Sequence, residues 1–310
     1  MASDGPPVPD LPDFIARRLP FDRRCVSLEK GSNRGLMLHT IDHGGRNDPA
    51  VLLAHGNPTW SFLWRKVISH LEGFRCVAPD LLGLGLSDRF SSPREHSLAR
   101  HADALAELVE QLGLTRVILV GQDWGGPIVT AVGARLPDRV AGIVLGNTSV
   151  LAPQRPRGTA FHRFANFPIV SDLVFRFLGF PLRSLHRVQG EPTSIRGDIA
   201  RAYRWPLSGL KDRASPLALA RMVPNSIDHP SYGELQKTEA WLRSFEGPMA
   251  LVWGRKDPIL GRALKRHTKA FPKASVTVTD GGHFLQEQVP EEMASAIQQV
   301  ATGNAGHTPN

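Results

Sequence analysis

Cysteine is scarce in this sequence. The 310 residues include two cysteines, Cys25 and Cys76, and each lies within an apolar stretch. A disulfide framework or a cysteine-rich metal site needs more cysteines at characteristic spacings. We therefore expect two buried thiols in the core of a protein from a reducing compartment. A chain of this length buries enough surface to fold without cross-links.

Long apolar runs are also missing. No stretch reaches the roughly 18 apolar residues that a membrane span needs, and the first 24 residues contain no continuous apolar run of the kind found in a secretory signal. The sequence therefore predicts a cytoplasmic protein with no cleaved signal and no membrane partner. It also lacks a G-x-G-x-x-G motif, a phosphate loop and a Cys/His cluster with metal-ligand spacing, so we expect neither cofactor nor metal.

Acidic residues are few in one segment. Residues 152–229 hold 12 Lys and Arg against 5 Asp and Glu, whereas the rest of the chain holds 25 against 24. Such a basic segment is usually a solvated face, although it could also meet an acidic surface or a second subunit. A nucleic-acid groove would need stacking aromatic side chains between the basic ones. Six phenylalanines lie between Phe161 and Phe180, but we expect them to face inward, so no nucleic-acid partner is predicted.

Short β-rich runs alternate with helical patterns along the chain. The candidate strands are residues 25–29, 36–41, 50–54, 74–78, 116–120, 140–145, 249–253 and 275–279, and the candidate helices are 60–72, 97–112, 125–136, 232–245, 260–271 and 289–301. This alternation predicts an α/β fold with an eight-stranded, mostly parallel sheet covered by helices on both faces.

Residues 152–229 interrupt this alternation. They contain eight prolines between short helical pieces and no convincing strand. We expect a helical cap, inserted after the sixth strand, over the carboxyl edge of the sheet. The core would then comprise residues 25–151 and 230–302, with an N-terminal extension at 1–24 and a flexible tail at 303–310. A helical subdomain whose phenylalanines fill only its own core remains the alternative.

A strand, a sharp turn and a helix are predicted within residues 116–128, RVILVGQDWGGPI. This is the context of the nucleophile elbow G-x-S-x-G, with Asp123 at the serine position. A carboxylate with a pKa of about 4 is ionised at neutral pH, so it attacks without a base. Attack at a saturated carbon would give an ester, which water can open. The alternative is a glycine-rich turn in which Asp123 caps the helix.

The second half of such a reaction needs a base, and His283 follows the eighth strand after a Gly-Gly turn. Asp257 follows the seventh strand, whereas the turn after the sixth offers Asn147 and no acid. The order nucleophile, acid, histidine is that of the elbow-containing hydrolases. We expect His283 to activate water and Asp257 to orient the imidazole. The alternative is that Asp257 only caps a helix ahead of Pro258.

The turn after the third strand reads HGNPTWSFLW, residues 55–64. The backbone N–H groups of Asn57 and Trp124 are expected to form an oxyanion hole for ester hydrolysis. The Asn57 amide and the Trp124 indole are also donors that could converge on a departing halide ion. Stabilisation of a turn by Asn57 and simple packing of Trp124 are the alternatives.

The motifs HGNPTWS, APDLLGLGLSD, VGQDWGGPI, VLGNT, WGRKDP and GGHFLQE together resemble those of the haloalkane dehalogenases of the α/β-hydrolase superfamily. The resemblance covers about residues 25–300 and is loose across the cap, whose pocket residues cannot be carried over. It implies Asp123 as nucleophile, His283 as base, Asp257 as acid, and Asn57 with Trp124 as the halide site, which is the pattern of one subfamily.

This resemblance also implies an activity. A haloalkane and water would give an alcohol and a halide ion through a covalent alkyl-aspartate ester, a detoxification reaction that needs no cofactor. Members of the subfamily with this pattern form larger assemblies, which implies a homo-oligomer here.

Epoxide hydrolases are the main competing family, because they share the aspartate elbow. They protonate the opened ring with two cap tyrosines. This chain has only two tyrosines, Tyr203 within the predicted cap and Tyr232 at its far edge. Fluoroacetate dehalogenases carry arginines directly after the nucleophile, where this chain has Trp124 and two glycines. A binding module that keeps the elbow as a scaffold is a third possibility, since fold does not fix function.

Overall fold

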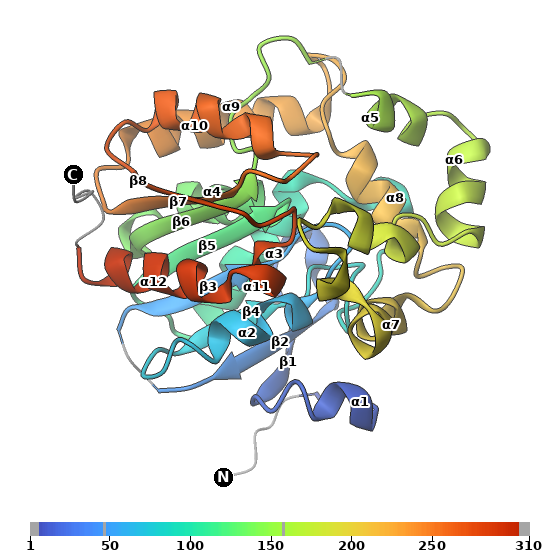
Figure 1. Ribbon diagram of the computed structural model, residues 1–310, viewed down its shortest axis with the longest axis horizontal. Helices are drawn as coiled ribbons and strands as arrows, with labels where there is room; N and C mark the ends of the chain where they lie inside the picture. Colours follow the sequence, from blue (N-terminus) through green and yellow to red (C-terminus); the bar gives the residue numbers. More distant parts are fainter. Residues whose placement is uncertain (1–5, 46–47, 157–158, 304–310) are drawn as a thin grey trace.

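The computed structural model describes residues 6–45, 48–156 and 159–303, so the predicted flexible tail at 303–310 lies, apart from Gly303, outside the described residues. Its centre is one eight-stranded sheet in the order β1-β2-β4-β3-β5-β6-β7-β8 (Figure 1). The strands are β1 (Arg23–Ser27), β2 (Met37–His43), β3 (Ala50–Ala54), β4 (Cys76–Pro79), β5 (Val117–Asp123), β6 (Val140–Thr148), β7 (Met249–Gly254) and β8 (Ser275–Thr279).

Strand β2 pairs antiparallel with β1 and β4, and the other neighbouring strands pair parallel. The predicted α/β class and eight-stranded, mostly parallel sheet are therefore confirmed. Because side chains alternate across a strand, both faces of the central strands need an apolar cover. In β5, Leu119 packs into one core cluster, whereas Ile118 and Val120 pack into the other.

Helices cover both faces of the sheet. Residues of α3 (Leu98–Gln111), α4 (Gly125–Arg135), α9 (Pro230–Ser244) and α10 (Leu264–Ala270) pack on the Leu119 side. Residues of α2 (Arg65–Ile68), α11 (Leu285–Gln288) and α12 (Pro290–Ala301) pack on the Ile118 side. The predicted helix 60–72 is shorter than expected and consists of a 3-10 turn, η2 (Ser61–Trp64), followed by α2. The remaining elements outside residues 152–229 are α1 (Asp13–Ala16), which lies in the predicted N-terminal extension, and η1 (Gly31–Asn33), η3 (Pro93–Glu95), η4 (Pro137–Arg139) and η9 (Gly261–Ala263).

Both cysteines are buried and free, as the sequence predicted. Burial raises the pKa of the Cys76 thiol to about 12, so this group stays protonated and packs as a small apolar side chain.

Residues 152–229, the predicted cap, lie between β6 and β7, and their described part contains no strand. It consists of α5 (Ala160–Ala165), α6 (Val170–Asp172), η5 (Leu173–Phe177), η6 (Leu182–Val188), η7 (Pro192–Ile195), α7 (Gly197–Arg204), η8 (Trp205–Leu207) and α8 (Ala214–Arg221). These elements follow one another around one side of the sheet (Figure 1). A small cluster of Phe175, Leu217 and Ala220, with Phe161, Phe164 and Phe180 at its edge, holds α5, η5 and α8 together.

The expectation that the cap phenylalanines face inward is wrong for two of them. Phe167 and Phe177 are 60% and 58% exposed. The small cluster between α5, η5 and α8 already holds the other four, and these two side chains lie outside it. Among the described residues, no helix combines the length and apolarity that a membrane crossing would require.

Candidate active site

Asp123 is the last residue of β5, at the turn into α4. Its φ is +51°, a left-handed conformation that is uncommon for a residue with a side chain and is often kept at functional sites. Close packing explains the glycines of the motif. A Cβ on Gly121 would come within 2.5 Å of the Gly125 carbonyl oxygen, and one on Gly125 would overlap the Ala54 carbonyl. The strand and helix can therefore meet only at glycines, and the Asp123 side chain remains 18% exposed.

The turn after β3 aims a backbone donor at this carboxylate. The Asn57 N–H donates to Asp123 Oδ1 at 2.8 Å. The turn is held from within, because the Gly56 carbonyl accepts from the Thr59 backbone N–H and hydroxyl at 2.9 and 3.0 Å. The buried His55 ring lies 3.0 Å from the same carbonyl and accepts the Leu81 N–H at 2.9 Å. His55 and Thr59 thus set the direction of the Asn57 N–H.

Three predicted residues meet at the carboxyl edge of the sheet. His283 Nδ1 lies 2.9 Å from Asp257 Oδ2, and His283 Nε2 lies 3.7 Å from Asp123 Oδ2. The Asp257 and His283 side chains are 0% and 2% exposed. Because the imidazole donates through Nδ1 to Asp257, Nε2 is the nitrogen that can accept a proton.

Asp257 uses its two oxygens differently. Oδ2 faces His283, whereas Oδ1 accepts the N–H groups of Ile259 and Leu260 at 2.7 and 3.1 Å. Asp257 therefore contacts His283, as one sequence interpretation expected. The other expected Asp257 to cap a helix, but the residues that it caps, 258–260, form a turn ahead of η9. The turn fixes the carboxylate, and the carboxylate fixes the imidazole.

The environment of His283 favours its charged form. Burial alone lowers the pKa of this imidazole, but the charge and hydrogen bond of Asp257, together with the charge of Asp123, outweigh it and raise the pKa above the ordinary value of about 6.5. Because part of this increase comes from the negative charge of Asp123, the pKa of His283 depends on whether Asp123 is ionised.

Two polar residues that sequence reasoning did not assign also hold the site together. Asn147, at φ +36°, accepts the Gly254 N–H at 2.9 Å and donates to the carbonyls of Gly282 and His283 at 2.7 and 3.1 Å. It thereby joins the turns that carry Asp257 and His283. Gln122 donates to the His283 carbonyl at 3.1 Å. From the sequence, Asn147 was only a polar residue after the predicted sixth strand. Its hydrogen-bond partners lie more than 100 residues away and could not be predicted.

Both predicted halide donors adjoin Asp123: Trp124 is the next residue in the chain, and Asn57 donates its backbone N–H to the carboxylate. Trp124 is 8% exposed. The Asn57 Nδ2 group donates one hydrogen bond to the Pro216 carbonyl of α8 at 2.9 Å, and it carries a second proton. Only the amide nitrogen can donate to a carbonyl, so this contact fixes the orientation of the amide. Pro216 thus positions Asn57 through its carbonyl, although the sequence analysis did not predict Pro216 as a residue of the site.

Tyr203 lies in a buried polar network rather than beside Asp123. Its hydroxyl donates to Glu287 at 2.6 Å, and Glu287 also pairs with Arg65 through two hydrogen bonds of 2.6 and 2.8 Å. One of the two tyrosines that epoxide opening would require is therefore engaged elsewhere. Within the described ranges, no group of three or more His, Cys, Asp or Glu side chains is arranged to hold a metal ion.

Comparisons with known proteins agree with this geometry. A family model described as the alpha/beta hydrolase fold matches residues 49–290. Haloalkane dehalogenase 2 of Mycobacterium tuberculosis is 34% identical, over 96% of this chain and 98% of the relative. The haloalkane dehalogenase of Psychrobacter cryohalolentis is 29% identical over 95% of both chains.

Solved structures give the same result. Haloalkane dehalogenase DbeA from Bradyrhizobium elkani superimposes with a TM-score of 0.79 at 25% identity, covering 91% of this chain and 99% of that one. The tetrameric haloalkane dehalogenase DpaA from Paraglaciecola agarilytica superimposes with a TM-score of 0.77 at 26% identity, covering 91% of this chain and 93% of that one. With an aspartate elbow in an α/β-hydrolase fold and curated relatives that match over nearly its whole length, this chain belongs to the haloalkane dehalogenases.

Proposed function

We propose that this enzyme hydrolyses haloalkanes in two steps through Asp123. In the first step, Oδ2 of the ionised carboxylate attacks the carbon that carries the halogen. An oxygen–carbon bond forms as the carbon–halogen bond breaks, and the bonding pair leaves with the halide ion. No base is needed, because the carboxylate is already deprotonated at neutral pH.

The second step would regenerate Asp123. Neutral His283 takes a proton from water through Nε2, and the resulting hydroxide attacks the ester carbonyl carbon, Cγ of Asp123. The carbonyl oxygen, Oδ1, then carries the negative charge, and the backbone N–H groups of Asn57 and Trp124 form its oxyanion hole. When this intermediate collapses, the Cγ–Oδ2 bond breaks and the departing alkoxide takes the proton from the His283 imidazolium to leave as the alcohol. The regenerated Asp123 carboxyl group then loses its proton to solvent. Asp257 stabilises the imidazolium that forms.

One observation carries this proposal: the two oxygens of Asp123 face different partners. Oδ1 accepts the Asn57 N–H at 2.8 Å, and Oδ2 lies 3.7 Å from His283 Nε2. One oxygen is therefore held where an oxyanion would need a donor, and the other faces the space from which the base acts.

The Asn57 side-chain amide and the Trp124 indole are proposed to hold the halide ion as it leaves. A halide is weakly basic and needs no proton, so two neutral donors in a largely buried site suit it. The contact of Asn57 with Pro216 supports this role, because it holds the amide in place without using its second proton.

The wider context of the enzyme follows from the same assignment. We propose that a small haloalkane and water are its substrates, that the cap of residues 152–229 serves as a lid over the core of residues 25–151 and 230–302, and that the enzyme acts in the cytoplasm without a nucleic-acid partner. Assembly into a homo-oligomer is also proposed, supported by a relative whose structure is described as tetrameric.

Replacing His283 by Phe is expected to trap the ester. The first step does not use the imidazole, so exposure to a bromoalkane should add the mass of one alkyl group to a peptide containing Asp123, as measured by mass spectrometry. The matched control is His283→Phe combined with Asp123→Asn, which should gain no mass. A folded His283→Phe variant that forms no adduct would count against the proposal.

Replacing Asn57 by Ala tests the halide site. The change keeps the backbone N–H that faces Asp123 and removes the side-chain amide together with its hydrogen bond to Pro216, so it should cost about 1–3 kcal/mol of transition-state stabilisation in the halide-releasing step. Single-turnover halide release measures this rate. Inhibition by added bromide should weaken in parallel. An unchanged rate and unchanged inhibition would remove Asn57 from the halide site.

The pKa of His283 should depend on the charge of Asp123. Asp123 contributes to the raised pKa of the free enzyme, so Asp123→Asn should shift the imidazole titration to lower pH. The alkyl ester of Asp123 is uncharged, so the pKa of His283 should also fall once the ester has formed. His283 would then be a neutral base over a wider pH range during hydrolysis. Titration of the His283 ring by NMR checks this shift, and an unchanged or higher pKa in Asp123→Asn would contradict it.

A further inference from the structure

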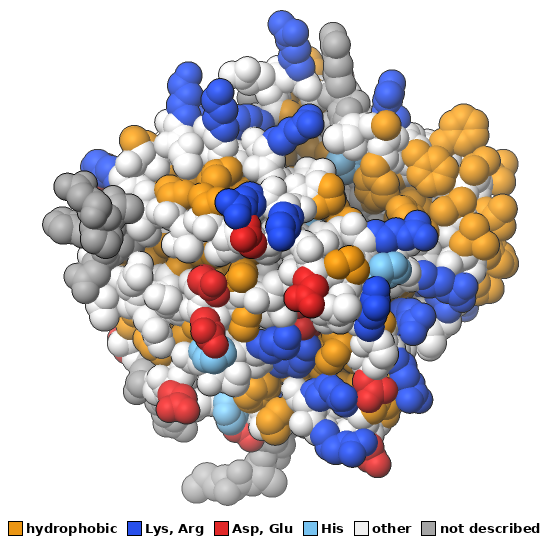
Figure 2. All heavy atoms as spheres, viewed as in Figure 1, with side chains coloured by type: hydrophobic (Ala, Val, Ile, Leu, Met, Phe, Trp, Pro, Cys, Tyr) orange, Lys and Arg blue, Asp and Glu red, His pale blue; other side chains and the backbone are white. Residues whose placement is uncertain are grey.

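The cap exposes a continuous apolar surface. Six large apolar side chains between the end of α5 and η6 are between 43% and 82% exposed: Phe167, Ile169, Val170, Leu173, Phe177 and Leu178. We call this set the cap face. Figure 2 shows hydrophobic side chains gathered on the side of the molecule where Figure 1 places α6. Scattered apolar residues are normal on a surface, but a contiguous group of this kind usually marks a contact with a partner or a membrane.

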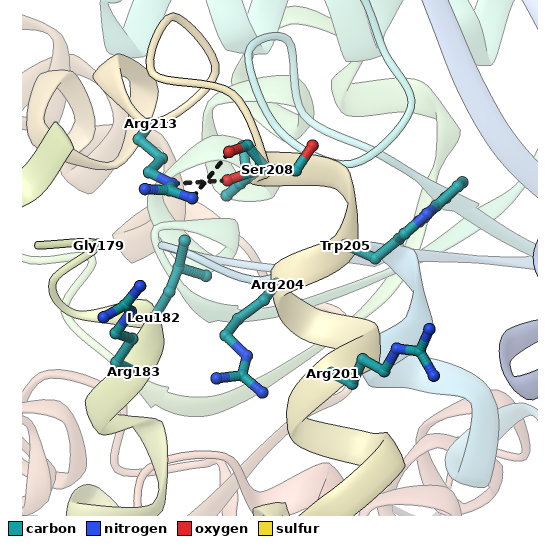
Figure 3. Close-up of a pocket in the computed structure, with 9 residues that line it drawn as sticks. Gly179, Leu182, Arg183, Arg201, Arg204, Trp205, Ser208 and Arg213 are labelled. Carbon is teal, nitrogen blue, oxygen red and sulfur yellow. Dashed lines mark hydrogen bonds between the residues drawn. The ribbon is translucent and has the colours of Figure 1, made fainter. Parts of the chain in front are cut away.

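A cavity of about 310 Å³ near this face is lined by four arginines, Arg183, Arg201, Arg204 and Arg213, together with apolar side chains such as Leu182 and Trp205. In Figure 3, Arg183 lies on one side of the cavity, Arg201 and Arg204 on the other, and Arg213 at the top. Arg213 is held in place by the carbonyls of Leu207 and Ser208 at 2.9 and 2.8 Å. The cavity therefore presents guanidinium groups beside an apolar wall.

No carboxylate pairs with these four arginines within the described part of the chain. Nearby acids are engaged by arginines outside the cavity. Asp172 pairs with Arg221 at 2.9 Å, Asp198 with Arg18 at 3.2 Å, and Asp212 with Arg89 at 3.3 Å. The positive charge of the cavity is consequently left for a ligand.

The cap face and the arginine cavity share one stretch of chain. Phe177 and Leu178 immediately precede Gly179, which lines the cavity. Arg213 also donates to the Arg176 carbonyl at 3.2 Å, which ties the cavity to η5. An apolar surface and a cationic recess thus lie side by side on the same face of the cap.

We propose that the cap binds the surface of an anionic phospholipid bilayer. The cap face enters the interfacial region of the bilayer, and the arginine cavity receives a headgroup phosphate, for which planar guanidinium groups are well suited. Apolar contact together with basic side chains is the combination that holds proteins at anionic membranes. The sequence predicted no membrane partner because spanning segments are absent, and a surface contact of this kind needs none.

The charge on this side of the cap favours a bilayer over a second copy of the chain. A two-fold contact through the cap face would place the same surface of both copies together. The arginine cavity of one copy would then lie near that of the other, without acids to neutralise them. An anionic lipid surface meets both the apolar and the cationic part of the same area.

Membrane binding would also bring the substrate to the site, a consequence that rests on the proposed function. Leu217 and Ala220 of α8 pack against the small cluster beneath η5, and the Pro216 carbonyl of α8 contacts Asn57. The bound bilayer and Asp123 would therefore be separated by α8 and its neighbours. Apolar haloalkanes dissolve in lipid, so an enzyme docked in this way would draw them from the bilayer.

The test is co-sedimentation of the full chain with vesicles, without any substrate, so that its outcome does not depend on dehalogenase activity. The protein is expected to bind vesicles of phosphatidylcholine and phosphatidylglycerol at about 0.1 M salt, and to bind less at about 1 M salt, where charges are screened within a few ångströms. Binding to vesicles of phosphatidylcholine alone should be much weaker.

Two double variants separate the two parts of the surface. Arg183→Gln with Arg204→Gln should weaken binding to the anionic vesicles about thirtyfold, since each basic side chain near such a surface contributes roughly a fivefold factor. Phe167→Ser with Phe177→Ser should weaken it roughly tenfold or more. The control for the arginine variant is Arg116→Gln with Arg243→Gln, and the control for the phenylalanine variant is Val278→Ser. Both alter exposed side chains outside the cap, and both should bind the vesicles as the unchanged protein does.

Several results would overturn the proposal. These are the absence of binding to anionic vesicles, equal binding to both lipid compositions, and equal loss of binding in the control variants. A lower mass of the Phe167→Ser/Phe177→Ser variant in analytical ultracentrifugation would show that the cap face joins two copies of the chain instead. Unchanged thermal unfolding and unchanged halide release from a water-soluble haloalkane would establish that the variants are folded and active.

Discussion

The hydrogen bond from the Asn57 N–H to Asp123 Oδ1 makes two equivalent oxygens different. A free carboxylate shares its charge equally, but this donor holds Oδ1 and leaves Oδ2 to face His283. The proposed mechanism needs this difference twice, first to direct one oxygen at the substrate and then to stabilise the other as an oxyanion. The bond exists because β3 and β5 are parallel neighbours, so the turns that follow them meet at one edge of the sheet.

The remaining parts of the site depend on the same edge. Asp257 and His283 follow β7 and β8, and Asn147, near the end of β6, bonds to the last residue of β7 and to the turn after β8. A side chain at the end of one strand thus fixes the separation between an acid and a base at the ends of two others. Asn147 contributes position rather than proton transfer, because a neutral amide neither gains nor loses a proton near neutral pH.

Much of the site could be predicted from sequence because its residues follow short, strongly patterned strands. Apolar runs located β3, β5, β7 and β8, and the residues after them included Asn57, Asp123, Asp257 and His283. What the sequence did not reveal was contact between distant segments. The Pro216 carbonyl is a backbone group with no side-chain signal, and its contact with Asn57 depends on how the cap packs. The exposure of Phe167 and Phe177 likewise depends on which side of α5 and η5 meets α8.

The central claim, that solvent oxygen passes through Asp123, is tested most directly by repeated turnover in water labelled with oxygen-18. Each hydrolysis of the proposed ester leaves a solvent oxygen in the carboxylate and transfers an oxygen of the enzyme to the alcohol. Mass spectrometry of the peptide containing Asp123 should therefore show the label accumulating at this residue. Labelled alcohol with an unlabelled Asp123 after many turnovers would mean that water attacks the substrate directly, and would contradict the account.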